Sequence, residues 1–270
     1  MAKAQRSWVI DFSILALIWG ASFLFIAVAG KALPPVGVTF FRMAFGAIAL
    51  FVLVKLAKQK IPMNREAWLK TLGAGLLMSA FPFTLFAYAE LHIASGLAGM
   101  VNAATPVMTV LAIMIAFRDQ KPTRVQLIGL AVGIVGTLVL LGVWRGFGEN
   151  DPLALGALIL ATMFYGFGSP YIRKVVSPLG LPNQVAVFMQ LTSASIATLP
   201  IYLFSGPLLT GTPDWASISS IITLGVLGTG IAYVFYYRII DAAGSTVASS
   251  VTIVQPVVAV ILGMLILHES

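Results

Sequence analysis

Residues 83–119, FTLFAYAELHIASGLAGMVNAATPVMTVLAIMIAFRD, recur 150 positions later as residues 233–269, YVFYYRIIDAAGSTVASSVTIVQPVVAVILGMLILHE. Each copy has the pattern of an aromatic-rich apolar helix, a short polar turn and a second apolar helix with a proline in its middle. The copies align without a gap, and the matched pairs include Ser95 and Ser245, Ala98 and Ala248, Pro106 and Pro256, and Asp119 and Glu269. Duplicated membrane hairpins interrupted by proline are one known way to build a transport site. The repeat therefore predicts a membrane transporter.

Composition indicates that the chain lies in a lipid bilayer. Of its 270 residues, 59% are hydrophobic and 9% are charged, and the mean hydropathy is +1.00, whereas soluble domains have roughly 25% charged residues. A membrane-spanning helix needs about 20 apolar residues. The chain divides into nine such runs, at about 9–30, 34–56, 67–89, 94–117, 124–144, 153–175, 182–205, 216–240 and 245–267. We expect no cleavable signal peptide, because the first run is long enough to span the bilayer.

The basic residues behind the net charge of +7 are divided unevenly between the two sides of the membrane. If the N-terminus is cytoplasmic and the chain changes side at each span, most basic residues lie inside, as the positive-inside rule requires. The thirteen inside positions, of 16 basic residues, are Lys3, Arg6, Lys55, Lys58, Lys60, Arg65, Lys70, Arg118, Lys121, Arg124, Arg173, Lys174 and Arg238. The basic excess is thus a signal of orientation, and we expect no nucleic-acid partner.

Several classes of chemistry find no support in the sequence. There are no cysteines, which excludes disulfides and thiolate metal sites. The two histidines, His92 and His268, are far apart and lack the spacing of metal ligands. No glycine-rich phosphate loop and no plausible catalytic trio occur. We therefore expect neither an enzyme nor an ATP-driven pump, with no cofactor and no metal.

Aromatic–glycine pairs stand at the midpoints of two corresponding spans. Trp19-Gly20 belongs to the first span and Tyr165-Gly166 to the sixth. Such a glycine lets a neighbouring backbone approach closely, and the ring beside it can line a cavity. Packing alone and cavity lining remain equally open here.

A buried cation in the second span needs a partner. Arg42 lies about seven residues into that span, where a guanidinium must face protein or water. Glu90, at the end of the third span, has a comparable depth on the same side. We expect the two to pair, as a structural clamp in preference to a substrate clamp.

Small and polar residues form a stripe on the fourth span and again on the ninth. Spacings of four and three connect Ser95, Gly99, Asn102, Pro106 and Thr109, and the ninth span repeats the pattern with Ser245, Ser249, Thr252 and Pro256, beside Gln255. The stripes either pack tightly or border a wet cavity. Proline frees backbone acceptors, so a polar partner should lie nearby. The preceding spans add aromatic rings, among which Tyr233 and Tyr236 are expected to point inward together.

These residues in combination resemble a known family. Tyr88, Ala94-Ser95, Ala98, Pro106 and Asp119, followed by Gln126, Gly129, Gly133 and Gly136, are similar to the EamA module of the drug/metabolite transporter superfamily, as are Tyr236, Gly244-Ser245, Ala248, Pro256, Gly263 and Glu269. One departure is Arg118-Asp119, where the family usually has Gly-Glu. The resemblance implies an all-α membrane protein of two inverted five-helix repeats, here residues 1–146 and 147–270, with both termini cytoplasmic. It also implies ten helices, so that about 25 to 30 further residues would form a tenth helix after Glu269.

The resemblance further implies a transporter in the bacterial inner membrane that exports or facilitates small metabolites, with amino acids as the favoured class. We expect a central cavity between the repeats, and we expect transport to proceed by alternating access at this cavity. Its expected lining is Trp19, Ser22, Phe86, Asn102, Tyr165, Tyr233, Tyr236, Ser249, Thr252 and Gln255, with structural or gating roles for Arg42, Glu90, Pro106 and Pro256. The expected partners are a small-molecule substrate and the lipid bilayer, and the protein is expected to be a monomer or a homodimer.

Two other functions remain open. A proton-coupled exporter of cationic or aromatic drugs would need an accessible carboxylate, for which Glu90 is the best candidate. A non-transporting scaffold would bury the polar stripes in helix contacts and leave no cavity. All nine acidic residues lie near span ends or in loops, whereas proton coupling favours a carboxylate at mid-membrane. We therefore favour gradient-driven efflux over proton antiport through Glu90 or Asp11.

Overall fold

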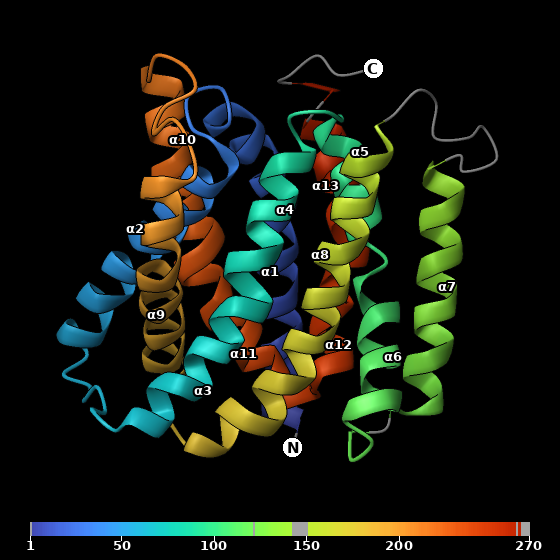
Figure 1. Cartoon of the computed structure of the whole chain (residues 1–270). Helices are drawn as coiled ribbons and strands as arrows, with labels where there is room; N and C mark the ends of the chain where they lie inside the picture. Colours follow the sequence, from blue (N-terminus) through green and yellow to red (C-terminus); the bar gives the residue numbers. More distant parts are fainter. Residues whose placement is uncertain (1, 121, 142–150, 263, 266–270) are drawn as a thin grey trace.

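Long apolar helices make up the part of the chain that the computed structural model describes, which is residues 2–120, 122–141, 151–262 and 264–265 (Figure 1). No strand occurs among these residues, which confirms the all-α prediction. The elements of the first half are α1 (Ala2–Ala29), α2 (Pro35–Leu56), α3 (Arg65–Gly75), η1 (Leu76–Ala80), α4 (Phe81–Ala89), α5 (Ser95–Asn102), α6 (Thr105–Ala116) and α7 (Arg124–Leu141). Those of the second half are α8 (Pro152–Tyr171), η3 (Ile172–Val176), η4 (Ser177–Leu179), α9 (Asn183–Phe204), α10 (Trp215–Gly225), η5 (Val226–Ile231), α11 (Ala232–Ala243), α12 (Ser245–Ser249) and α13 (Val251–Leu262).

Seven helical segments are long and apolar enough to cross a membrane. They are Trp8–Ala29, Pro35–Leu56, Arg65–Ala89, Ser95–Ala116, Pro152–Leu179, Asn183–Phe204 and Trp215–Ala243, and each coincides with one predicted span to within a few residues. The predicted fifth and ninth spans correspond to shorter apolar helices, Arg124–Gly136 and Ser245–Val258. The predicted repeat junction at residue 146, His268 and Glu269 lie outside the described residues.

The third and eighth spans each contain a π-helical turn at the same place in the repeat. Segment η1 begins at Leu76 and η5 begins at Val226, which are 150 positions apart. A π-turn inserts an extra residue and leaves a carbonyl outside the regular ladder, and such turns are frequent at functional sites. The duplication therefore extends from the sequence to an irregular backbone feature.

The prolines of the duplicated hairpin do not both lie inside a helix, which corrects the sequence interpretation. In the first copy the helix breaks at residues 103–104, and Pro106 lies in the first turn of α6. Proline is tolerated there because its missing N–H would have no intrahelical partner. In the second copy the chain turns at Ser250, and Pro256 lies within α13. Each of these spans is therefore two helices in series.

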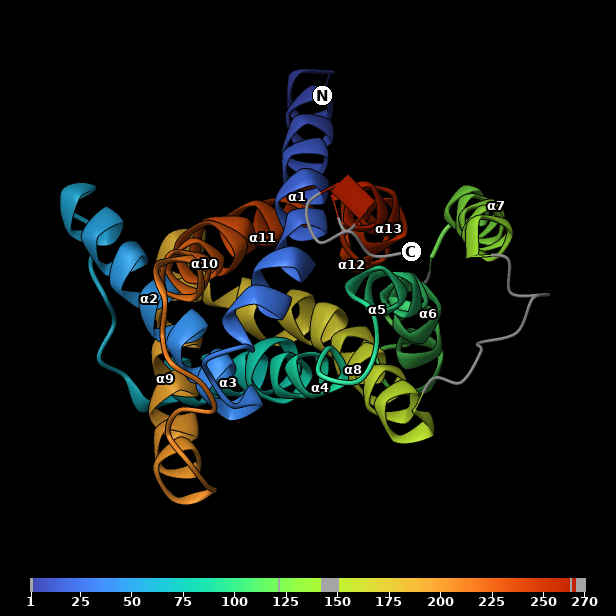
Figure 2. The same ribbon diagram turned by 90° about the horizontal axis from the view of Figure 1, so that it is seen from above.

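Corresponding helices of the two halves make corresponding contacts. Helix α1 packs against α13, and its counterpart α8 packs against α6. A Cβ on Gly20 would lie 2.4 Å from the Val258 Cβ, and one on Gly166 would lie 2.6 Å from the Met108 Cβ, so both contacts require glycine. Helices α1 and α8 run in opposite directions in Figure 1. Seen from above, α7 lies at the edge of the bundle (Figure 2).

Candidate solute-binding cavity

A cavity of about 50 Å³ lies between the two halves. It has room for a few water molecules, since a water needs at least about 10–15 Å³ on this measure. Helix α1 contributes Trp19, Ser22, Phe23 and Ile26, and the remaining lining residues are Arg42, Met78, Phe83, Phe86, Asn102, Thr105, Tyr165, Tyr233, Tyr236, Thr252 and Gln255. The lining thus combines aromatic rings with neutral polar groups and one cation.

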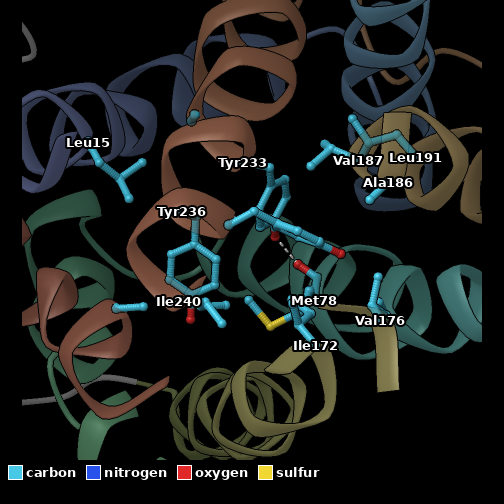
Figure 3. Packing of buried hydrophobic residues seen from close by; sticks show 14 of the residues in the cluster. Leu15, Met78, Ile172, Val176, Ala186, Val187, Leu191, Tyr233, Tyr236 and Ile240 are labelled. Carbon is cyan, nitrogen blue, oxygen red and sulfur yellow. Dashed lines mark hydrogen bonds between the residues drawn. The ribbon is translucent and has the colours of Figure 1, made fainter. Parts of the chain in front are cut away.

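Two aromatic side chains on this lining donate hydrogen bonds to carbonyls in η1 and η5. The Trp19 indole Nε1 donates a hydrogen bond of 3.0 Å to the Gly228 carbonyl in η5. The Tyr233 hydroxyl donates to the Met78 carbonyl in η1, as Figure 3 shows. Met78 and Gly228 are 150 positions apart, so the acceptors are repeat equivalents. Each of these two π-turns is therefore held by a ring from the other half of the molecule.

The same rings contact each other across the cavity wall. Trp19 meets Tyr233 edge-on, with the ring centroids 5.7 Å apart, and the Trp19 and Tyr236 centroids are 5.1 Å apart. The Tyr236 hydroxyl lies 2.5 Å from the Ser169 Oγ of α8. These rings make both apolar and hydrogen-bonding contacts, so they pack together as one wall of the cavity. This places Tyr233 and Tyr236 inward together, in agreement with the sequence interpretation.

A hydrogen-bonded chain of amides joins the two polar stripes. The Asn102 Nδ2 donates to the Gln255 Oε1 at 2.7 Å, and the Thr105 Oγ1 donates to the Asn102 Oδ1 at 3.0 Å. Asn102 and Gln255 belong to different halves of the molecule, on α5 and α13. The stripes therefore both pack together and border a cavity, so the two alternatives that the spacing left open are combined.

Arg42 is 4% exposed and faces this cavity from α2. Its Nε donates a hydrogen bond of 3.1 Å to the Thr229 Oγ1, and its Cζ lies 3.5 Å from the centroid of the Phe83 ring. The Glu90 carboxylate interacts with it electrostatically. Glu90 itself lies at the end of α4, outside the cavity lining. The predicted Arg42–Glu90 interaction is thus electrostatic, while the hydrogen bond of Arg42 goes to Thr229.

Most residues that the sequence singled out come together at this cavity. Nine of the ten expected lining residues border it. The exception is Ser249, which is buried on α12 and donates its hydroxyl hydrogen bond to the Thr246 carbonyl. Pro106 and Pro256 lie near the lining without being part of it. The sequence interpretation missed Phe23, Ile26, Met78, Phe83 and Thr105 as lining residues; for Phe83, the alignment of its ring with Tyr233 was an available signal.

The fold and the cavity define a multi-pass membrane transporter. A family model described as the EamA-like transporter family matches the chain twice, over residues 6–142 and 152–270. The chain therefore belongs to the EamA-like transporter family of the drug/metabolite transporter superfamily.

Relatives and a solved structure agree with this assignment. The chain is 26% identical over 250 residues to the "Uncharacterized inner membrane transporter YedA" of Escherichia coli (strain K12), with 92% of this chain and 79% of that protein covered. It is 27% identical over 271 residues to the "Probable amino-acid metabolite efflux pump" of Salmonella typhimurium, with 95% and 86% covered. The fold is similar to a crystal structure with a TM-score of 0.74 and 18% identity, covering 98% of this chain and 90% of that one.

Proposed function

We propose that the protein exports or facilitates small metabolites, with amino acids as the favoured class, across the bacterial inner membrane. The observation that carries this proposal is the cavity between the repeats, lined by rings and by neutral polar groups such as Asn102, Thr252 and Gln255. Such a lining suits small, partly apolar solutes with polar ends. A relative that bears the name of an amino-acid metabolite efflux pump adds support. The N-terminus lies in the cytoplasm in this proposal, because that orientation puts most basic residues inside.

Transport proceeds by alternating access in this account. At about 50 Å³, the cavity has room for a few waters only, so a solute of amino-acid size requires the helices around it to separate. The halves meet at corresponding contacts, which supports two equivalent openings, one to each side. The repeats, residues 1–146 and 147–270, rock against each other about this cavity.

The alternative is a proton-coupled exporter of cationic or aromatic drugs, and the charges favour it less. Among the described residues that line the cavity, none is acidic and one, Arg42, is a cation. A cationic drug would meet an unfavourable charge there. Glu90 and Asp11, the candidate proton carriers, both lie outside the lining. Gradient-driven efflux therefore remains the favoured mechanism.

Efflux from liposomes tests the proposal. Purified protein is reconstituted, the vesicles are loaded with a mixture of labelled amino acids, and release is followed with and without a pH gradient. We expect release that exceeds that from loaded liposomes without the protein and that is independent of the pH gradient. Release that requires the gradient would contradict the facilitator mechanism, and the absence of release for every amino acid would contradict the substrate class.

A further inference from the structure

Arg42 has a structural counterpart in the other half of the molecule, and this counterpart, Gln190, carries no charge. A Cβ on Gly225 would lie 2.9 Å from the Arg42 carbonyl oxygen, and a Cβ on Gly75 would lie 2.7 Å from the Gln190 carbonyl oxygen. The two glycines are 150 positions apart. The same close contact thus occurs twice, with Arg42 on α2 in one and Gln190 on α9 in the other.

The side chains at these positions make the same contact to a π-turn. The Arg42 Nε donates to the Thr229 Oγ1 in η5, and the Gln190 Nε2 donates to the Ser79 Oγ in η1 at 3.1 Å. Thr229 and Ser79 are again 150 positions apart. The bond from α2 or α9 to its π-turn can therefore be made by a neutral amide, and holding the helices together does not require a charge.

Their surroundings differ in one respect. The Gln190 side chain is fully buried, and its Oε1 also accepts a hydrogen bond of 2.5 Å from the Tyr237 hydroxyl. Arg42 instead borders the cavity. In the part of the chain that the structure describes, its one hydrogen bond uses Nε, while the Phe83 ring covers a face of the guanidinium. The donors on its two terminal nitrogens are therefore available for a ligand.

We propose that Arg42 binds the carboxylate group of the solute and so makes this a site for small carboxylates, amino acids included. The proposal rests on the proposed function for the identity of the site. A guanidinium presents parallel N–H donors that match a carboxylate. Arg42 is the one charge among the described lining residues and lies away from bulk water. Its attraction for a carboxylate is therefore weakly screened, and the Glu90 carboxylate outside the lining offsets part of it. The aromatic rings beside it would hold the apolar part or the ammonium group of the solute.

The test compares two probes that differ by one charge, 3-phenylpropionate and its neutral amide, 3-phenylpropionamide. Their binding to the full chain in detergent is measured by titration of thermal unfolding. We expect the wild type to bind the carboxylate about tenfold to a hundredfold more tightly than the amide, as loss of a charge-assisted hydrogen bond implies. Arg42→Gln, which copies the equivalent position, should bind both probes equally.

Two further variants keep the test decisive. Arg42→Lys retains the charge without the paired donors, so it should prefer the carboxylate by a smaller factor, even if Arg42→Gln does not fold. Gln190→Met removes the equivalent contact away from the cavity, and it should lower the unfolding temperature while leaving the preference for the carboxylate intact. Equal binding of the two probes by the wild type, or a full preference in Arg42→Gln, would overturn the assignment.

Failure of this inference can be distinguished from failure of the proposed function, because binding in detergent needs no transport. A carboxylate preference that depends on Arg42, without amino-acid efflux from liposomes, would leave the assignment standing and contradict the substrate class. Amino-acid efflux with equal binding of the two probes would support the proposed function and contradict the role of Arg42.

Discussion

At the scale of single residues, glycines mark the places where the two halves approach most closely. Gly20 and Gly166 touch corresponding positions on α13 and α6, and Gly75 and Gly225 touch corresponding positions on α9 and α2. Within a membrane, helices associate through close packing because burial of apolar surface provides no net drive between them. These glycines therefore hold the repeats together around the cavity.

Gly225→Ala should destabilise the protein measurably. The added Cβ would lie 2.6 Å from the Phe45 Cβ and 2.9 Å from the Arg42 carbonyl, so α10 must move away from α2. We expect a loss of about 1–3 kcal/mol, typical of overpacking, seen as a lower unfolding temperature in detergent. The matched control is Gly156→Ala, where a Cβ would have no neighbour within 4 Å and helix propensity favours alanine by up to about 1 kcal/mol. Equal losses in both variants would contradict this explanation.

The sequence predicted the lining best where helical spacing runs unbroken. Trp19 and Tyr165 could be placed because each stands beside a glycine at mid-span. Asn102 could be placed because the residues of its stripe lie on one helix face up to the break at residues 103–104. Ser249 was misplaced because the chain turns at Ser250, and a uniform helical spacing carried across that turn gives the wrong face. Met78 was missed because it lies inside a π-turn, which the apolar pattern does not reveal.

At the scale of the elements, the π-turns η1 and η5 are each bonded by a side chain from the opposite half. The Tyr233 hydroxyl bonds the Met78 carbonyl and the Trp19 indole bonds the Gly228 carbonyl. A buried carbonyl without a donor is costly, so these bonds stabilise the irregular turns. Neither turn could be predicted from the sequence, because a single extra residue changes neither composition nor length noticeably.

Tyr233→Phe should cost about 1–3 kcal/mol, because it leaves the Met78 carbonyl without its donor in a buried place. The measurement is thermal unfolding of the purified variant. Tyr202→Phe is the control: the Tyr202 hydroxyl donates to the Leu208 carbonyl at 2.8 Å, and Leu208 is 46% exposed, so water can replace the lost bond. A loss for Tyr202→Phe as large as that for Tyr233→Phe would indicate that the π-turn has no special requirement.

At the scale of the whole molecule, the duplication organises the fold. The gapless shift of 150 positions predicted the paired hairpins, and the structure places both beside one cavity. That the two hairpins lie close together was predictable, because a duplicated half needs its copy to complete the bundle. The packing of α1 on α13 and of α8 on α6 was not predictable. The sequence pattern shows which helix face carries small residues, but not which helix packs against that face.

Access to the cavity from both sides of the membrane is the central claim, and the chain is well suited to test it because it contains no cysteine. Ser22→Cys places one thiol on the lining. In vesicles of known orientation, a membrane-impermeant maleimide is applied to each side in turn, with and without an amino acid. We expect labelling from either side, at a rate that a bound solute lowers. Labelling from one side only, or from neither, would contradict alternating access at this cavity.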